Sequence, residues 1–300
     1  MWGIYGVPPA ELAAWPDAAT QLSPHIPGSA ALEAAAEGSL AGLTMVAPAN
    51  TFERRHEVGL ALRALAAGAP LTVLAAKNKG GARLAAELTA FGCDVIEQAR
   101  RHFRICSARR PAGIRGLERA LEDGAPRRIE ALGLWSQPGV FSWDRIDPGS
   151  RLLAEQLPAL AGRGADIGCG IGYLARSVLA SPKVEHLILI DLDRRALAMA
   201  QRNVERERTR FVWADVAREG TGLSGLDFVV MNPPFHAGGR EDRSLGQGFI
   251  RRAADSLRPG GTLWLTANRH LPYEAPLRSL FREVALRGEG LGFKVYLATK

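Results

Sequence analysis

The segment Asp166-Ile-Gly-Cys-Gly-Ile-Gly172 joins a short apolar run, typical of a buried strand, to a helix-like stretch that begins near Tyr173. Gly168, Gly170 and Gly172 remove side chains where a backbone must turn tightly and approach a ligand. A turn of this kind, after the first strand of a parallel sheet, is where doubly wound α/β folds bind nucleotide-like cofactors. A glycine trio alone is also compatible with a tight turn that binds nothing, so the flanking residues decide.

Acidic residues around this loop narrow the choice of cofactor. Asp191 ends the next strand-like run, where a carboxylate can accept hydrogen bonds from both ribose hydroxyls of an adenosyl group. NAD-binding domains offer the same contact, but GxGxG with an acid two positions earlier favours S-adenosylmethionine over the GxGxxG that seats a pyrophosphate. We therefore expect Asp166 near the methionine end of the cofactor. Asp215, after a third strand-like run, either accepts from the adenine amino group or caps a turn.

Strand-like and helix-like runs alternate along both halves of the chain. In the second half, strand patterns cover 186–191, 211–215, 226–232 and 262–267, with a closing pair near 281–286 and 292–298. In the first half, strand-like runs at 42–48, 71–76 and 93–97 alternate with helix-like runs at 51–67 and 81–91. This βαβαβ order predicts a parallel sheet. The sequence thus predicts two doubly wound, Rossmann-like α/β domains in tandem, residues 1–133 and 134–300, joined by a connector rich in Gly, Pro and aromatic residues.

Asn232-Pro-Pro-Phe235 closes the fourth strand-like run of the second half and is the most specific motif in the chain. Two prolines cannot continue a strand ladder, so they hold an extended backbone at the carboxyl edge of the sheet. The Asn232 amide oxygen and the Pro233 carbonyl could accept both N–H bonds of a planar amino group and aim its lone pair at a methyl donor. Pro234 stiffens the turn, and Phe235 could stack on an extruded base. His236 either contacts the substrate or is merely exposed.

The composition fits a nucleic-acid substrate without proving one. The formal net charge is +7, and clustered Lys and Arg gain free energy on phosphates by releasing counterions. The opening has no secretory apolar run, and no stretch of about 18 residues is free of charge, which predicts a cytoplasmic protein without membrane contact. Cys93, Cys106 and Cys169 show no CxxC spacing, so neither a metal site nor a disulfide framework is expected.

Several segments together resemble the bacterial ribosomal RNA guanine-N2 methyltransferases of the small-subunit RsmC type and their large-subunit relatives. The segments are PGVFSWDRIDPGSRLL (138–153), DIGCGIGYLA (166–175), NPPFHAG (232–238), LRPGGTLWLTANRHLPYE (257–274) and GFKVYLA (292–298). A looser resemblance in the first half covers KNKGGARLAAELTAFG (77–92) and RRHFRICSARR (100–110).

The resemblance implies a class I methyltransferase fold, S-adenosylmethionine as cofactor, and N2 of a guanine in ribosomal RNA, most simply 16S, as acceptor. It implies that Phe141 and Ser142 line the cofactor pocket, and we include Cys169 and Leu192, which lie within or beside the motifs. It also implies that the first half is a second methyltransferase domain without a cofactor site, with an RNA-binding or stabilising role.

The segment from Gln98 to Arg110 is the basic part of that first half. Arg100, Arg101 and Arg104 lie beside Phe103, a mixture suited to phosphate contacts and base stacking. An edge strand followed by a solvated turn would have the same composition. We treat the three arginines as tentative substrate-binding residues.

Other functions remain open at the level of sequence. The NPPF motif also suits adenine N6 or a protein glutamine amide, since both present a planar NH2 group. A non-catalytic RNA-binding or ribosome-assembly factor could keep the same scaffold. A nicotinamide-dependent oxidoreductase would leave the NPPF motif unexplained.

Overall fold

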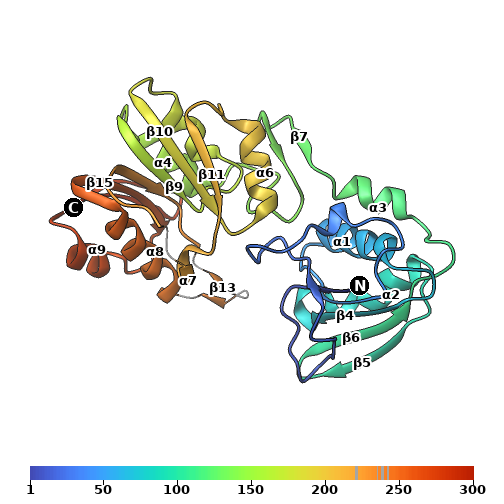
Figure 1. Cartoon of the computed structure of the whole chain (residues 1–300). Coiled ribbons are helices and arrows are strands. Elements are labelled where there is room, and N and C mark those ends of the chain that lie inside the picture. Colours follow the sequence, from blue (N-terminus) through green and yellow to red (C-terminus); the bar gives the residue numbers. More distant parts are fainter. Residues whose placement is uncertain (220–221, 235, 238–239, 242) are drawn as a thin grey trace. The chain divides into compact units, whose positions relative to one another are not determined.

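The computed structural model describes residues 1–219, 222–234, 236–237, 240–241 and 243–300 (Figure 1). The chain divides into two compact units, each described here by itself. The N-terminal unit comprises Met1–Pro126 with Gln137–Gly139, and the C-terminal unit comprises Arg127–Ser136 with Val140–Lys300.

The boundary expected at residue 133 falls inside a hairpin of the C-terminal unit, formed by β7 (Arg127–Ile129) and β8 (Leu134–Ser136). The side chain of Asn203 holds this hairpin. Its Oδ1 accepts from Trp135 N at 2.7 Å, and its Nδ2 donates to the carbonyls of Trp135 and Ile171 at 2.8 and 2.9 Å. Asn203 thereby links the hairpin to the glycine-rich loop, to which Ile171 belongs.

The N-terminal unit is built on one mixed sheet of strand order β2-β1-β3-β4-β6-β5. Its strands are β1 (Trp2–Tyr5), β2 (Thr20–Gln21), β3 (Gly42–Val46), β4 (Pro70–Ala76), β5 (Ile96–Arg100) and β6 (Phe103–Arg109). Its helices are η1 (Leu32–Ala34), α1 (Thr51–Ala64), the π-helical turn η2 (Lys77–Gly81), α2 (Ala82–Ala90) and α3 (Leu117–Asp123). Helix α1 is buried along most of its length, and apolar residues of α1, α2, β3 and β4 form the core.

The prediction of a parallel sheet in this unit was wrong for its last two strands. The run expected at 93–97 forms β5 three residues later, and β5 pairs antiparallel with β6, which is itself antiparallel to β4. The reason is the two-residue turn between β5 and β6, since only antiparallel neighbours can be joined so tightly. Its residues Arg101 and His102 have φ of 45° and 66°, values normally taken by Gly or Asn, so the sequence carries no turn signal.

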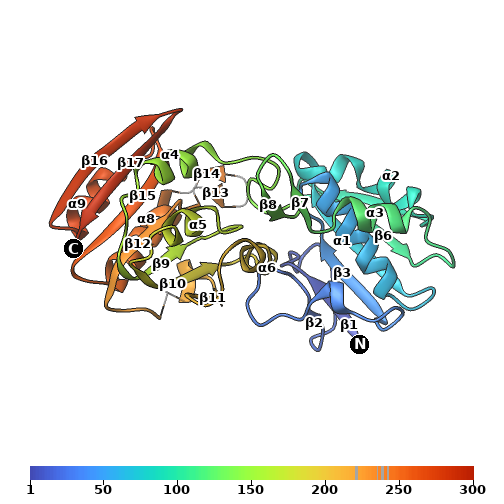
Figure 2. The ribbon, with the colours of Figure 1, turned by 90° about the horizontal axis from the view of Figure 1, so that it is seen from above.

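The C-terminal unit contains a sheet of order β11-β10-β9-β12-β15-β17-β16 (Figure 2). Its strands are β9 (Gly162–Ile167), β10 (Val184–Asp191), β11 (Thr209–Trp213), β12 (Leu226–Met231), β15 (Leu257–Asn268), β16 (Glu283–Gly290) and β17 (Phe293–Thr299). The first five strands in this order are parallel, and β17 is antiparallel to β15 and β16. A short hairpin, β13 (His236–Ala237) with β14 (Arg240–Glu241), follows the NPPF motif.

Helices cover both faces of this second sheet, so it is doubly wound as predicted. They are α4 (Pro148–Gln156), α5 (Tyr173–Leu179), α6 (Arg194–Asn203), α7 (Val216–Glu219), α8 (Arg243–Ser256) and α9 (Glu274–Leu280). One buried cluster joins α4, α5 and α6 to the sheet through residues such as Leu153, Val178 and Leu197. The other joins α8 and α9 to the opposite face through Ile250, Tyr273 and Leu277.

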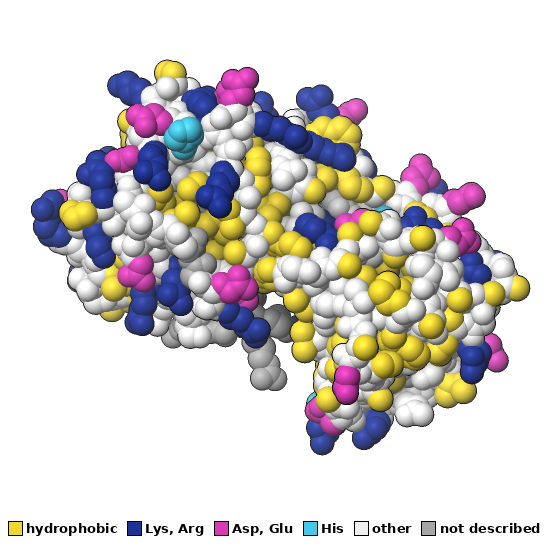
Figure 3. All heavy atoms as spheres, viewed as in Figure 1, with side chains coloured by type: hydrophobic (Ala, Val, Ile, Leu, Met, Phe, Trp, Pro, Cys, Tyr) yellow, Lys and Arg dark blue, Asp and Glu magenta, His cyan; other side chains and the backbone are white. Residues whose placement is uncertain are grey.

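Two predictions from the sequence concern membrane contact and the distribution of charge on the surface. Among the described residues, no helix combines the length and the apolar character needed to cross a membrane. On the face of the C-terminal unit shown in Figure 3, Lys and Arg side chains are interspersed with Asp and Glu.

Candidate active site

The glycine loop lies between β9 and α5, as the sequence predicted. Gly168, Gly170 and Gly172 have φ of 77°, 53° and 83°, a region that side-chain-bearing residues rarely adopt. A Cβ atom at Gly172 would lie 3.3 Å from side-chain atoms of Ala200 and Val204, whereas a Cβ atom at Gly170 would meet nothing within 4 Å. Gly172 thus allows close packing of α5 on α6, and Gly170 leaves open space for a ligand.

Asp191, at the end of β10, accepts one backbone hydrogen bond from this loop and one from the start of the next turn. Its Oδ2 accepts from Gly170 N at 2.7 Å, and its Oδ1 accepts from Asp193 N at 2.8 Å. These bonds fix the Asp191 carboxylate at the end of β10, beside the glycine loop. The next residue, Leu192, is fixed through its carbonyl, which accepts from Trp213 Nε1 at 2.8 Å.

Asp166 is fully buried behind the loop, and among the described residues neither carboxylate oxygen has a hydrogen bond of good geometry, although the backbone N–H of Ala175 is near enough to lower its pKa slightly. Burial raises the pKa of Asp166 to about 8, and the nearby charge of Asp191 acts in the same direction. Burial, with the charges of Asp191 and Asp166, also raises the pKa of the Cys169 thiol well above its ordinary value. A buried polar group without a partner is costly and indicates a ligand or a functional role.

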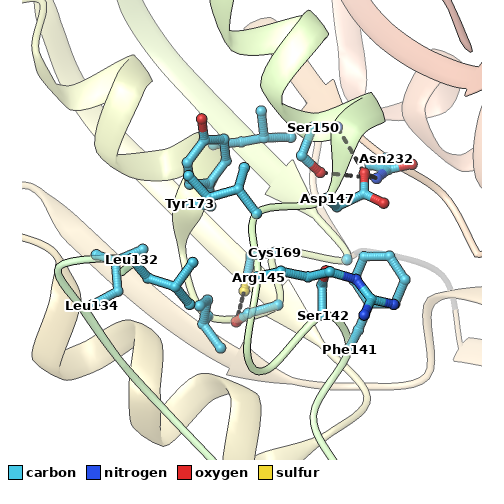
Figure 4. Close-up of a pocket in the computed structure, with 15 residues that line it drawn as sticks. Leu132, Leu134, Phe141, Ser142, Arg145, Asp147, Ser150, Cys169, Tyr173 and Asn232 are labelled. Atoms are coloured by element: carbon cyan, nitrogen blue, oxygen red, sulfur yellow. Dashed lines mark hydrogen bonds between the residues drawn. The ribbon is translucent and has the colours of Figure 1, made fainter. Parts of the chain in front are cut away.

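A pocket opens between the loop and the connector, and both contribute to its wall (Figure 4). Six predicted residues line it: Phe141, Ser142, Gly168, Cys169, Gly170 and Asn232. Ser142 has φ of 52°, a strained value for a residue with a side chain. Phe141 is 61% exposed despite its size, so its ring is available to cover a ligand. The pocket therefore joins the predicted cofactor loop to the predicted catalytic motif.

Asn232 follows β12 and lines the pocket, where two residues at the start of α4 bind its side chain. Its Nδ2 donates to Asp147 Oδ2 and to Ser150 Oγ, each at 2.9 Å. Of the two prolines, Pro233 is buried and Pro234 is exposed. Phe235 lies outside the described residues, as does the side chain of His236, whose backbone belongs to β13.

Comparison with known proteins agrees with this geometry. The methyltransferase small domain family model matches residues 131–297. Ribosomal RNA small subunit methyltransferase C of Pseudomonas fluorescens is 31% identical over 298 residues, which covers 92% of this chain and 87% of that protein. The chain belongs to this methyltransferase family.

Two further relatives define how far the likeness extends. Ribosomal RNA small subunit methyltransferase C of Hahella chejuensis is 36% identical over 182 residues, but the match covers 59% of this chain and only about half, 52%, of that relative. The solved structure of T. thermophilus 16S rRNA N2 G1207 methyltransferase (RsmC), in complex with AdoMet and guanosine, has 27% identity and a TM-score of 0.74. It aligns with 90% of this chain and 76% of its own, which shows the two-domain class I methyltransferase fold.

Other predicted residues of this family member lie outside the pocket wall. Asp215 Oδ1 accepts from Ala217 N at 3.1 Å, so it caps α7, the alternative considered from the sequence. Arg100 ends β5, Arg101 pairs with Glu11 at 2.7 Å, and Arg104 pairs with Glu97 at 3.2 Å. All three arginines belong to the N-terminal unit.

Sequence reasoning missed several residues that line the pocket, including Leu132, Leu134, Asp147, Ser150 and Tyr173. For Asp147 a signal was present, because Asp followed by Pro is a typical start of a helix. Nothing in the local sequence indicated that this helix cap would also contact Asn232, which is 85 residues away.

Proposed function

We propose that this protein transfers a methyl group from S-adenosylmethionine to the exocyclic N2 amino group of a guanine in small-subunit ribosomal RNA, acting in the cytoplasm. The observation that carries the proposal is the single pocket shared by the glycine loop and Asn232. The likeness to the T. thermophilus enzyme, solved with AdoMet and guanosine, supports guanine as the acceptor.

The residues around the loop fit the cofactor. The open space at Gly170, the carboxylate of Asp191 and the buried, partnerless carboxyl of Asp166 are the features that an adenosyl group with a polar amino-acid tail would require. In the proposal, Asp191 accepts from the ribose hydroxyls, Asp166 lies toward the methionine end, and Phe141 and Ser142 cover the pocket. The bound cofactor supplies a methyl group on a positively charged sulfur, which a neutral nitrogen nucleophile can attack.

Asn232 and Pro233 act on the substrate in this proposal. The amino group of guanine is a weak nucleophile because its lone pair is delocalised into the ring. The Asn232 amide oxygen and the Pro233 carbonyl accept hydrogen bonds from the two N–H groups, which localises the lone pair and directs it at the methyl group. Attack produces a cationic nitrogen that loses its proton afterwards, so positioning carries most of the rate. Phe235 is proposed to stack on the base.

The N-terminal unit is proposed to bind RNA phosphates or to stabilise its partner unit. Arg100 and Arg101 are exposed at one end of its sheet, where cationic side chains can meet a phosphate backbone. Neither residue lines the pocket described above, so their proposed contribution concerns RNA affinity and its salt dependence rather than chemistry.

The experiment is transfer of labelled methyl from S-adenosylmethionine to total RNA, 30S and 50S particles, DNA and protein from a strain lacking the gene, followed by nucleoside analysis. Label in N2-methylguanosine of 16S RNA is the expected result. Label in N6-methyladenine or in protein would overturn the substrate while keeping the chemistry. Cofactor binding without any transfer would favour a non-catalytic assembly factor.

A further inference from the structure

The Asn232 side chain makes two hydrogen bonds that the proposed chemistry does not by itself require. Two acceptors on the segment around the start of α4, Asp147 Oδ2 and Ser150 Oγ, each receive a hydrogen bond from Asn232 Nδ2 at 2.9 Å (Figure 4). Both acceptors are more than 80 residues away in the chain, so the contact exists only in the folded protein, where α4 packs on the sheet that contains β12.

These bonds decide which way the carboxamide points. A carboxylate offers only acceptors, so Asp147 can face the NH2 side of an amide but repels its oxygen. Rotating the Asn232 amide by half a turn would set its oxygen against Asp147 Oδ2 and break that bond, whereas the Ser150 hydroxyl could turn and donate. The NH2 group is therefore held toward α4, and the Asn232 oxygen is left as the group that a substrate can meet.

The acceptors themselves are held by the start of a helix rather than by a loose loop. Asp147 caps α4, and the same Oδ2 that meets Asn232 also accepts from Ser150 N at 2.8 Å. Ser150 is only 8% exposed. A Cβ atom at Gly149 would lie 2.6 Å from the Phe293 ring and 3.2 Å from Asp147 Oδ2, so only glycine fits between them. Side chains locked in this way can orient a neighbour with little freedom.

We propose, on the basis of the function proposed above, that Asp147 and Ser150 are positioning residues that make Asn232 a pure hydrogen-bond acceptor toward the substrate. With its NH2 group engaged, Asn232 cannot donate to a carbonyl oxygen, so it favours an amino group over the O6 side of guanine. The pair acts through Asn232 and does not touch the reacting atoms.

The first test is Asp147→Asn, assayed for methyl transfer and for cofactor binding. Asparagine can cap α4 only with its oxygen toward Ser150 N, and the same oxygen would still face Asn232, so this variant keeps the cap but weakens the orientation by removing the negative charge. We expect kcat to fall by about 10-fold, the scale of weakening one charge-assisted hydrogen bond, with the Kd of S-adenosylmethionine nearly unchanged. Ser150→Ala, which removes one of the two acceptors, is expected to lower kcat less.

A double-mutant cycle separates positioning from a general structural role. In the Asn232→Ala background, Asp147→Asn is expected to cause no further loss, because the group it orients is gone. The reciprocal exchange, Asn232→Asp with Asp147→Asn, restores a donor facing an acceptor and is expected to regain part of the activity lost in Asn232→Asp alone. The matched control is Asn50→Asp at the cap of α1, in a unit that supplies no described residue to the pocket, and it is expected to leave transfer within about twofold.

A second readout does not depend on turnover. In NMR spectra of the full chain, the two Asn232 side-chain N–H protons are expected to be protected from exchange in the wild type and to lose protection in Asp147→Asn. The inference is overturned by unchanged kcat and protection in Asp147→Asn, by a loss of cofactor affinity instead of kcat, or by additive losses in the cycle. An inactive wild type with protected Asn232 protons would reject the proposed function and leave the orientation established.

Discussion

The two units share one strand arrangement, but different residues lie at the carboxyl edge of each sheet. Without β11, the C-terminal order β10-β9-β12-β15-β17-β16 has the same parallel and antiparallel pairings as the N-terminal order β2-β1-β3-β4-β6-β5. The two strand orders therefore agree, strand by strand, with the expectation that the first half is a related domain without a glycine loop. What separates the units is the chemistry at matching strand ends.

The ends of β2 and β10 illustrate the difference. In the N-terminal unit Gln21 occupies the place that Asp191 has in the other, and both hold the turn after the neighbouring strand. Gln21 Oε1 accepts from Gly6 N at 3.2 Å and Ser23 N at 3.0 Å, while its Nε2 donates to Gly6 O at 2.8 Å. Gln21 keeps a structural hydrogen bond of this kind, but its amide is neutral and has one acceptor oxygen where a carboxylate has two.

The ends of β3 and β12, which occupy the same place in the two strand orders, differ still more. Where the C-terminal unit has Asn232 beside a pocket, the N-terminal unit has the buried guanidinium of Arg54, which is 1% exposed. Arg54 donates to the carbonyls of Pro48 and Ala49 and forms a bidentate pair with Glu87, with both distances 2.7 Å. A Cβ atom on Gly80, in the turn after β4, would collide with it. The same edge is thus filled by the chain itself, which teaches that this fold permits a site but does not create one.

The largest expected effect is the pH dependence of stability that Asp166 should give the C-terminal unit. Asp166 has a folded-state pKa of about 8, raised from 3.8 by burial, whereas strand β1 of the N-terminal unit contains no acidic residue. Between about pH 4 and 8 the unfolded state loses this proton while the folded state keeps it, so stability should fall as pH rises. At about 1.4 kcal/mol per pKa unit the total is several kcal/mol.

This effect is measured as the urea midpoint of the C-terminal unit from pH 5 to 8, for the wild type and Asp166→Asn. The variant should lose most of the slope and be the more stable at pH 8. An equal slope in both proteins would show that Asp166 ionises normally in the folded state.

Arg54→Ala should be the most destabilising change in the N-terminal unit. It leaves Glu87 and two carbonyls without their donor, at a cost of about 3–5 kcal/mol for a broken buried pair. Chemical denaturation measures this loss. The control is Arg119→Ala, which removes an exposed ion pair with Asp123 and should cost less than about 1 kcal/mol. Equal costs for the two variants would mean that Arg54 does not hold this edge.

Asn232→Ala should lower methyl transfer while leaving cofactor affinity nearly intact. Loss of one positioned polar group costs about 2–4 kcal/mol of transition-state stabilisation. Asn50→Ala, after the corresponding strand of the N-terminal unit, should cost about 1 kcal/mol of stability by loss of a helix cap and leave transfer unchanged. Full activity of Asn232→Ala would remove the NPPF motif from the mechanism.

Asp191→Ala should weaken cofactor binding first, by about 1.5–3 kcal/mol, the range for hydrogen bonds to a charged group. Titration calorimetry with S-adenosylmethionine measures the change. Gln21→Ala removes the matching side chain from the N-terminal unit and should leave cofactor affinity as it is. A comparable loss from both variants would break the proposed division of roles between the units.

Much of the catalytic half could be read from the sequence because its signals are local. The glycine loop, the acid after β10 and the proline-terminated strand each sit within a few residues of the strand that places them. Strand alternation then brought these ends to one edge, as parallel sheets require. The N-terminal half was read less well, since β1 and β2 are short and the turn at Arg101 and His102 lacks the usual turn residues.

The sequence by itself determined the fold class and the kind of cofactor, and it located the NPPF motif that is proposed to act on the substrate, because spacing and residue type specify these at short range. Only the tertiary structure decided the orientation of Asn232 by Asp147 and Ser150, the burial of Asp166 and the closure of the N-terminal edge by Arg54. Each depends on atoms that are distant in the chain and meet within about 3 Å, a distance over which hydrogen-bond geometry, not composition, sets the energy.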